Sequence, residues 1–368
     1  MQFTVTKDDL VAPLQLVSGA VEKRQTLPVL ANLLLRVDNG KLMITATDLE
    51  VEMSVEISLE GEYFEGDITV PARKFLDICK SLSGEHPIRV VLEEGRIKIS
   101  SGRSRFSLST ISAQEFPNIE ETVFTLGLTI DSQELKSLID KTQFAMAHQD
   151  VRYYLNGMLL EFNDSELTSV ATDGHRLALS RVKLTDSVGD EITQAIVPRK
   201  GVIEAVKLLS TAVGDCRLEI SNNHIRVVLS PFVFTSKLID GRFPDYNKVL
   251  PKNAQRVLVT DKSKIREAFS RAAILCNEKF RGVRLNIDDN KLIIHANNPE
   301  QEEAEVELDV DYQHEALEIG FNVSYLMDAL NAIHSENVRF NLGDSNSSVL
   351  IENSESSDSL YVVMPMRL

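Results

Sequence analysis

A formal net charge of −16, from 39 lysines and arginines against 55 aspartates and glutamates, excludes a protein that coats nucleic acid with a uniformly basic surface. The 368 residues and the 43% hydrophobic fraction predict two or three globular domains, and three cysteines without a CxxC pair argue against a disulfide framework. The N-terminal MQFTVTKDDL is unlike a signal peptide and no apolar run approaches the ~18 residues of a membrane helix, so we expect a cytoplasmic protein with no membrane partner.

The first predicted element is a short strand followed by an amphipathic helix, in the stretch FTVTKDDLVAPLQLV. This unit recurs as LTIDSQELKSLIDKT and again as VTDKSKIREAFSRA. The three helices have candidate N-caps at Thr6, Asp131 and Asp261. The recurrence indicates an internal repeat of roughly 125 residues.

Three further units follow in the same order in each copy. A hairpin with an Asn- or Asp-containing turn comes first, then a second strand and helix, then a closing hairpin. The hairpins cover 33–48, 158–173 and 283–298, the strand–helix units 70–82, 197–209 and 319–333, and the closing hairpins 97–110, 225–238 and 349–364.

The sequence therefore predicts an α+β fold with three tandem modules, each built as βαβββ twice. Stretches that read as linkers place the modules at 1–125, 126–253 and 254–368. Helices that are apolar on one side and alternating strands predict that sheets carry the helices on one face.

The turn Thr172–Arg176 is the best candidate for catalysis, because Asp173 and His175 lie close together in the sequence. The first copy has a Thr-Asp turn at the same position, starting at Thr47, so the turn belongs to the architecture of the module. A phosphate loop, a GxSxG elbow, an HExxH motif and metal-spaced cysteines are all absent from the sequence. We predict no catalytic residue, metal or cofactor, and interpret the turn as a peptide or ligand site, with a plain loop as the alternative.

Charge is unevenly distributed along the chain. Three predicted helices carry ten basic and three acidic residues, at 70–82, 198–210 and 262–275. The closing hairpin of the first copy is basic, whereas the strand near 300–307 is acidic. Opposite charges at the two ends favour head-to-tail pairing of two copies into a ring, and the apolar terminal MPMRL favours a binding surface.

The chain resembles the bacterial DNA polymerase III beta subunit family, the sliding clamps, over its full length. The matching runs include VPARKF, SGRSRFSLST, MAHQDVRYYLNGML, TDGHRLA, FTSKLIDGRFPDY, NEKFRGVRL, NNPEQEEAE and YVVMPMRL. The resemblance implies a head-to-tail homodimer whose six modules form a ring, with helices inside, sheets outside and double-stranded DNA threaded through without sequence preference. It implies the replicative polymerase alpha subunit, the clamp loader delta subunit and other clamp-binding-motif proteins as partners.

The resemblance also implies three sets of site residues. The partner-peptide pocket would comprise Leu155, Thr172, Gly174, His175, Arg176, Leu177, Pro244, Lys248, Val249, Asn346, Val362, Val363, Met364, Pro365, Met366, Arg367 and Leu368. DNA contacts would comprise Arg24, Arg73, Gln149, Tyr153, Tyr154, Arg199 and Lys200. The dimer contact would join Lys74, Arg103, Arg105, Phe106 and Leu108 to Ile274, Leu275, Glu300, Glu302, Glu303 and Glu305.

Lys248 and Asn346 differ from the family, which often has arginine and an aliphatic residue at these positions. Two other functions remain open on the residues alone. A hydrolase would use Asp173 and His175, and a repeat scaffold would never meet DNA.

Overall fold

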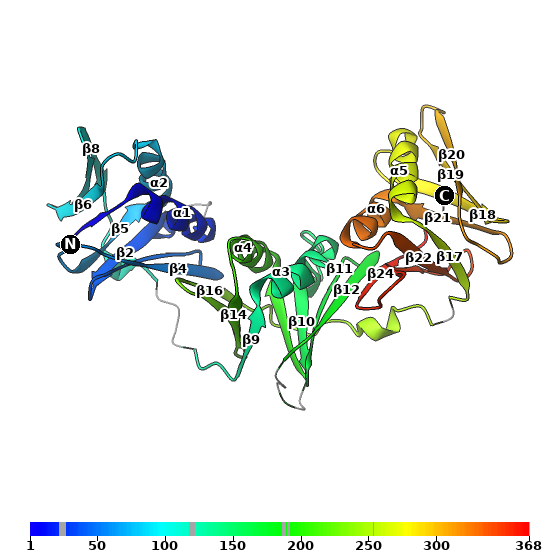
Figure 1. Cartoon of the computed structure of the whole chain (residues 1–368), viewed down its shortest axis with the longest axis horizontal. Coiled ribbons are helices and arrows are strands. Elements are labelled where there is room, and N and C mark those ends of the chain that lie inside the picture. The colour runs from blue at the N-terminus through cyan, green and yellow to red at the C-terminus, as the bar shows by residue number, and fades with distance from the viewer. Residues whose placement is uncertain (22–26, 118–121, 186–188, 190–191, 253, 368) are drawn as a thin grey trace. The chain divides into compact units, whose positions relative to one another are not determined.

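The computed structural model describes residues 1–21, 27–117, 122–185, 189, 192–252 and 254–367. Along these residues the order βαβββ occurs six times, twice in each predicted module. The predicted fold class and the predicted order of elements are therefore confirmed (Figure 1).

The helices and strands have the following bounds. The helices are α1 (Lys7–Val17), α2 (Ala72–Ser81), α3 (Ser132–Asp140), α4 (Arg199–Leu209), α5 (Lys262–Ala272) and α6 (Val323–Ala332). The strands of the first module are β1 (Gln2–Val5), β2 (Asn32–Asp38), β3 (Lys41–Thr47), β4 (Val51–Ser58), β5 (Gly66–Pro71), β6 (Ile88–Glu93), β7 (Arg96–Ser101) and β8 (Ser104–Ser109). Those of the second are β9 (Leu126–Asp131), β10 (Gly157–Asn163), β11 (Glu166–Thr172), β12 (Arg176–Lys183), β13 (Thr193–Pro198), β14 (Asp215–Ile220), β15 (His224–Leu229) and β16 (Phe232–Lys237). Those of the third are β17 (Arg256–Asp261), β18 (Gly282–Asp288), β19 (Lys291–Asn297), β20 (Glu303–Asp309), β21 (Leu317–Asn322), β22 (Asn337–Leu342), β23 (Val349–Asn353) and β24 (Ser359–Val363).

The first helix of each module begins where the sequence places its cap. The Thr6 hydroxyl accepts the Asp9 amide at 3.1 Å, and the Asp261 carboxylate accepts the Lys264 amide at 2.8 Å. The Asp131 carboxylate accepts the Gln133 amide at 2.9 Å. Each side chain satisfies an amide that the first turn of a helix leaves without a partner, so all three predicted caps are confirmed.

The described residues form two compact units, 1–133 with 200–238 and 134–199 with 239–368. The first unit contains an eight-stranded sheet, β5-β2-β3-β4-β16-β15-β14-β9, and a four-stranded sheet, β1-β6-β7-β8. The second contains an eight-stranded sheet, β13-β10-β11-β12-β24-β23-β22-β17, and a four-stranded sheet, β20-β19-β18-β21. The predicted module boundaries remain a prediction.

Each eight-stranded sheet joins strands that belong to different repeats. In the first unit β4 of the first copy pairs with β16 of the second, and in the second unit β12 of the second copy pairs with β24 of the third. We call these two pairings the β4–β16 and β12–β24 junctions. The third copy's counterpart of β4 and β12 is β20, and the first copy's counterpart of β16 and β24 is β8. Both are edge strands of the four-stranded sheets.

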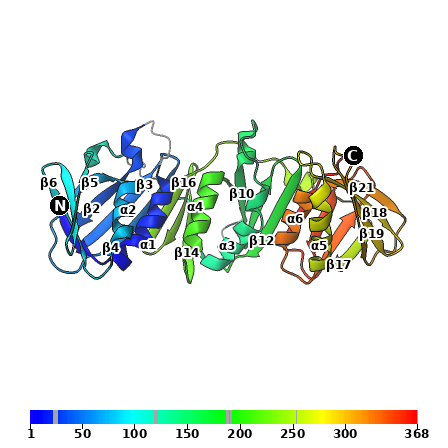
Figure 2. The ribbon, with the colours of Figure 1, turned by 90° about the horizontal axis from the view of Figure 1, so that it is seen from above.

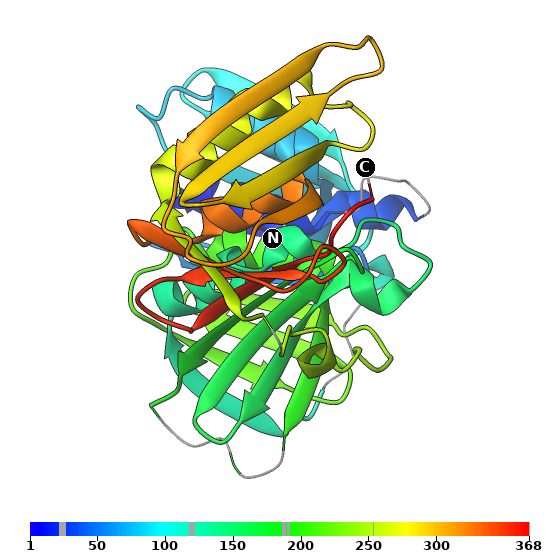
Figure 3. The same cartoon turned by 90° about the vertical axis from the view of Figure 1, so that its right-hand side faces the viewer.

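Helices cover one face of the sheets in each unit. In the first unit α1 and α2 lie side by side over β2 to β5 (Figure 2). Leu10 and Leu14 of α1 and Phe75 of α2 are fully buried. In the second unit α5 and α6 lie behind the strands of the C-terminal four-stranded sheet when that sheet faces the viewer (Figure 3). On the opposite face of each sheet, any cover must come from loops.

Candidate peptide-binding cleft and the family of the chain

The turn before β12 is built in the same way as the turn before β4. The Thr172 hydroxyl donates to the Arg176 carbonyl at 2.6 Å, as the Thr47 hydroxyl donates to the Val51 carbonyl at 2.8 Å. The carboxylate of Asp173 accepts the amide of His175 at 2.9 Å and that of Arg176, the first residue of β12, at 3.0 Å. The carboxylate is therefore used by the turn, which supports an architectural role for the Thr-Asp pair.

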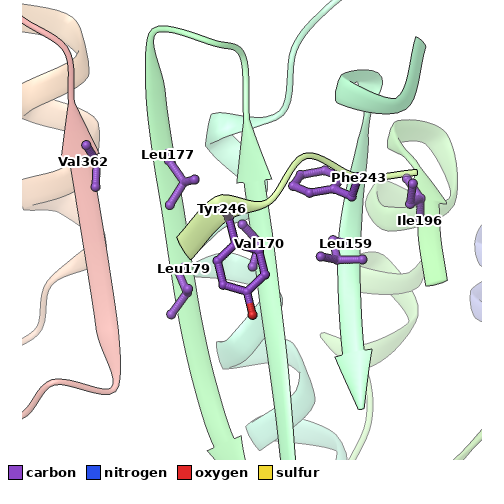
Figure 4. Close-up of a cluster of buried hydrophobic side chains, with 8 residues drawn as sticks. All are labelled: Leu159, Val170, Leu177, Leu179, Ile196, Phe243, Tyr246 and Val362. Carbon is purple, nitrogen blue, oxygen red and sulfur yellow. The ribbon is translucent and has the colours of Figure 1, made fainter. Parts of the chain in front are cut away.

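A row of apolar side chains crosses the second unit on the sheet face opposite the helices. The strand registers place Ile196, Leu159, Val170, Leu179 and Leu360 directly beside one another on five successive strands. Side chains two residues apart on a strand point to the same face, so a second row, with Leu177 opposite Val362, lies next to the first. The buried members of both rows form one cluster (Figure 4).

The segment after β16 covers part of this face. Phe243 and Tyr246 are buried against the apolar rows (Figure 4). Val249 is partly buried against the same cluster. The Tyr246 hydroxyl donates to Glu161 at 2.7 Å, and burial together with this bond raises the pKa of the tyrosine. The other end of the rows, at Leu177 and Val362, lies next to the C-terminal segment.

The C-terminal segment continues β24 beside the Leu177–Val362 end of the rows. The Met364 amide donates to the His175 carbonyl at 3.0 Å, and the Met366 amide donates to the Gly320 carbonyl at 2.8 Å. Val362 and Val363 are buried, whereas the Met364 side chain is 38% exposed. An exposed methionine at the rim of a buried apolar row gives this cleft an adaptable apolar wall.

Most of the predicted pocket residues meet here. Leu155 and Leu177 are buried, and His175 is exposed at the turn. Gly174 has φ +87°, and the Arg152 guanidinium lies where a Cβ on this residue would collide with it. The exposed residues include Pro244 and Arg367, whereas Pro365 and Met366 are half-buried. Leu368 lies outside the described residues.

Lys248 and Asn346 belong to two loops that lie on either side of a hollow next to the apolar cluster. The Lys248 ammonium pairs with Asp245 at 3.3 Å and is largely exposed. A hollow of about 310 Å³ separates the two loops and is lined by Lys248, Val249, Leu250, Pro251, Lys252, Ala254, Gly343, Ser347 and Ser348. The Asn346 amide donates to Asp344 at 2.9 Å, and its side chain is exposed. Because Val249 and Leu250 also pack against the apolar cluster, the hollow adjoins the cleft.

Arg176, also predicted as a pocket residue, contacts the helix layer through its side chain. Its guanidinium lies on the helix face of the sheet, where it pairs with Asp173 and Asp328 and donates to the Phe144 carbonyl at 2.8 Å. It also stacks on the Tyr325 ring, 4.5 Å from the centroid. Phe144, Tyr325 and Asp328 could not be predicted as partners of Arg176, because only the strand pairing shows that α6 lies next to this turn.

The predicted DNA contacts differ in how free their side chains are. Arg73 and Gln149 are exposed, and Tyr153 is 58% exposed with Tyr154 edge-on to it at 5.8 Å between ring centroids. Lys200 pairs with Asp48, and Arg199 donates to the Met146 carbonyl at 3.3 Å. Arg24 lies outside the described residues.

The predicted dimer residues lie at two open sheet edges and beside them. Arg103, Arg105, Phe106 and Leu108 are on or next to edge strand β8, and Lys74 is exposed on α2. Glu303 and Glu305 are exposed on edge strand β20, with Glu300 and Glu302 just before it. Ile274 is 77% exposed in the 3₁₀ turn Ala273–Leu275.

Three family models of the DNA polymerase III beta subunit match the chain. The N-terminal domain matches residues 1–120, the central domain 129–245 and the C-terminal domain 247–367. The chain belongs to this family. Beta sliding clamps from Vibrio cholerae and Escherichia coli are 54% and 53% identical to it, with all of both chains covered.

Solved structures agree with this assignment. The DNA polymerase sliding clamp of Pseudomonas aeruginosa, 53% identical, has a TM-score of 0.97 with all of both chains covered, and one structure of it is bound to griselimycin. A clamp from Bartonella birtlesii, 37% identical, has a TM-score of 0.96. The chain is thus a DNA sliding clamp that tethers the polymerase. Membership of a family of DNA clamps rules out the scaffold that never meets DNA. The hydrolase is ruled out because the family is a non-catalytic processivity factor.

Proposed function

We propose that this sliding clamp binds its partners through the cleft at the β12–β24 junction, where an apolar segment of the replicative polymerase alpha subunit or the clamp loader delta subunit inserts. The observation that carries the proposal is the pair of apolar rows, which lead from the covered cluster to the exposed Met364. An apolar cleft with a polar rim is the usual form of a peptide site.

The other two sheet positions of the same kind lack this chemistry. At the β4–β16 junction the counterparts of Leu177 and Leu179 are Glu52 and Ser54, and on edge strand β20 they are Glu303 and Glu305. Carboxylates in an apolar cleft would carry a desolvation cost. This comparison supports one peptide site per chain, at the β12–β24 junction.

Deleting residues 364–368 tests the proposal. The deletion removes the exposed methionine wall and leaves Val362 and Val363 in β24, so the sheet is expected to persist. We expect the affinity for a fluorescein-labelled Gln- and Leu-rich peptide to fall at least tenfold, about 1.4 kcal/mol, in fluorescence anisotropy. Equal affinity of the full-length and shortened proteins would place the peptide site elsewhere.

The homodimer proposal follows from the two junctions within the chain. Phe234 of β16 lies opposite Met53 of β4, and Tyr361 of β24 lies opposite Ala178 of β12. The repeat counterparts on the edge strands are Phe106 of β8 and Ala304 of β20. The same register between two copies sets Arg105 opposite Glu305 of the second copy, which supports a head-to-tail ring closed by opposite charges.

The DNA proposal is that duplex DNA passes through this ring and meets Arg24, Arg73, Gln149, Tyr153 and Tyr154. The exposure of Arg73, Gln149 and Tyr153 supports it, whereas Tyr154 is half-buried beside the apolar cluster. Arg199 and Lys200 already have partners within the chain, and we propose that they act mainly on the local structure. Contacts to the DNA backbone carry no sequence information, which permits sliding.

A cytoplasmic location completes the proposal. The helices described in the structure include none that is long and apolar enough to cross a membrane. Cell fractionation of the native protein, with the replicative polymerase followed in parallel, tests the location.

A further inference from the structure

Arg176 begins β12 on the face of the sheet away from the proposed cleft. Leu177 and Leu179 face the cleft, and because side chains alternate along a strand, Arg176 and Ala178 face the helices. The backbone of the same residue belongs to the cleft, since its amide and carbonyl are bonded by Asp173 and Thr172 within the turn. One residue therefore connects the turn at the cleft to the helix layer.

The guanidinium is held on several sides within the second unit. Its Nε lies 3.1 Å from Asp173, its Nη2 donates to the Phe144 carbonyl, and its Nη1 pairs with Asp328 of α6. The Tyr325 ring, also on α6, lies against its flat face. The side chain is only 13% exposed, so its charge is balanced mainly by these groups and little by water.

The arrangement is specific to this junction. The residue that corresponds to Arg176 at the β4–β16 junction is Val51, which carries no charge. Strand pairing of Pro198 with Gly157, and of Asn322 with Gly282, shows that Glu204 of α4 corresponds to Asp328 of α6. Glu204 instead pairs with Lys207 on its own helix at 2.8 Å, and its other carboxylate oxygen lies against Gly19.

We propose that Asp328 is a positioning residue for the peptide cleft. By holding the Arg176 guanidinium from the helix layer, it fixes the turn 172–176 and with it the His175 carbonyl that accepts the Met364 amide. The inference rests on the proposed peptide site and names a residue on the opposite face of the sheet that sets its affinity.

Loss of the Asp328 charge leaves Arg176 with Asp173 and the Phe144 carbonyl, so the turn loosens without the sheet losing a strand. A peptide that needs the ordered turn must then order it on binding, and affinity falls by that cost. By linkage, peptide bound in the cleft must stabilise the pairing of Arg176 with α6 by the same factor.

The experiment compares Asp328→Asn with Asp328→Glu and with Glu204→Gln, the corresponding residue of the other junction. In anisotropy with the labelled Gln- and Leu-rich peptide we expect Asp328→Asn to bind about fivefold more weakly, with Asp328→Glu and Glu204→Gln within twofold of the unmodified protein. Without peptide, hydrogen exchange at the amides of His175 and Arg176 should be faster in Asp328→Asn alone.

Two outcomes overturn the inference. Unchanged peptide affinity and unchanged exchange in Asp328→Asn would show that Arg176 does not depend on α6. An equal loss of affinity in Asp328→Asn and Glu204→Gln would show a general effect on stability. Failure of the proposed peptide site itself looks different: deletion of 364–368 would leave affinity unchanged while the exchange at His175 and Arg176 still responded to Asp328→Asn.

Discussion

Glu52 shows how one residue decides the chemistry of a sheet position. It occupies the place that Leu177 has at the β12–β24 junction, and burial raises the pKa of its carboxyl, an effect that the nearby Arg226 charge only partly offsets. Arg226 itself stacks on Phe124, 4.2 Å from the ring centroid. The first junction thus holds a partly buried carboxyl where the second holds the apolar side chain of Leu177.

Glu52→Gln should stabilise the protein at neutral and higher pH. A carboxyl whose folded pKa is raised contributes stability below its unfolded pKa of about 4.5, and this contribution is lost as the pH rises through the folded pKa. The amide does not titrate, so the gain over the unmodified protein, on the order of 1 kcal/mol at pH 8, should shrink toward pH 4. Urea unfolding at several pH values measures it, and a gain that grew toward low pH would contradict the assignment.

Single residues were predictable where their role is local. The caps Thr6, Asp131 and Asp261 could be predicted because a cap depends only on the residues of its own first turn. The role of Arg176 could not, because its partner Asp328 is 152 residues away and the two meet only through the pairing of β12 with β24.

At the scale of elements, one long side chain ties the two helices of a module together. The Lys7 ammonium, at the start of α1, donates to the Lys80 carbonyl at 2.9 Å and to the Leu82 carbonyl at the end of α2. Lys262 does the same for α6 through the Ile333 carbonyl at 2.9 Å. A cation there satisfies carbonyls that the last turn leaves without partners and interacts favourably with the helix dipole.

Lys7→Met should therefore lower the free energy of unfolding by about 1–2 kcal/mol, because the change leaves the two carbonyls at the end of α2 without their charged donor. Lys41→Met is the matched control, since Lys41 makes only an exposed pair with Glu56 and should cost less than about 0.5 kcal/mol. Urea unfolding followed by circular dichroism compares the two. Equal losses would show that the bonds of Lys7 add nothing.

The elements themselves were predictable and their joining was not. Hydrophobic periodicity is a local signal, so every hairpin and strand–helix unit could be placed from the sequence. The β4–β16 and β12–β24 junctions depend on which edges meet, and no residue pattern along one strand specifies its neighbour. The proposed cleft lies at such a junction. Its turn at 172–176 and its terminal MPMRL could be singled out from the residues, whereas the other pocket residues came from the family resemblance.

At the scale of the whole molecule, the assembly that we propose depends on the remaining pair of edges. β8 carries Arg105 and β20 carries Glu305, each exposed at an edge whose backbone groups are open to a further strand. A ring of two copies contains this contact twice, so a change in either residue acts at both places where the ring closes. Ring closure in turn determines whether the protein can stay on DNA that has no ends.

A charge exchange between the two edges tests both the register and the ring. Arg105→Glu or Glu305→Arg alone places like charges opposite each other and should raise the dimer dissociation constant at least tenfold, about 1.4 kcal/mol. The double variant restores opposite charges and should recover most of the dimer in sedimentation and its retention on closed circular DNA after loading. Retention should end for every variant once the circle is cut, because no contact reads the sequence. If the double variant stays as monomeric as either single one, Arg105 does not face Glu305 and the register transferred from the two internal junctions is wrong.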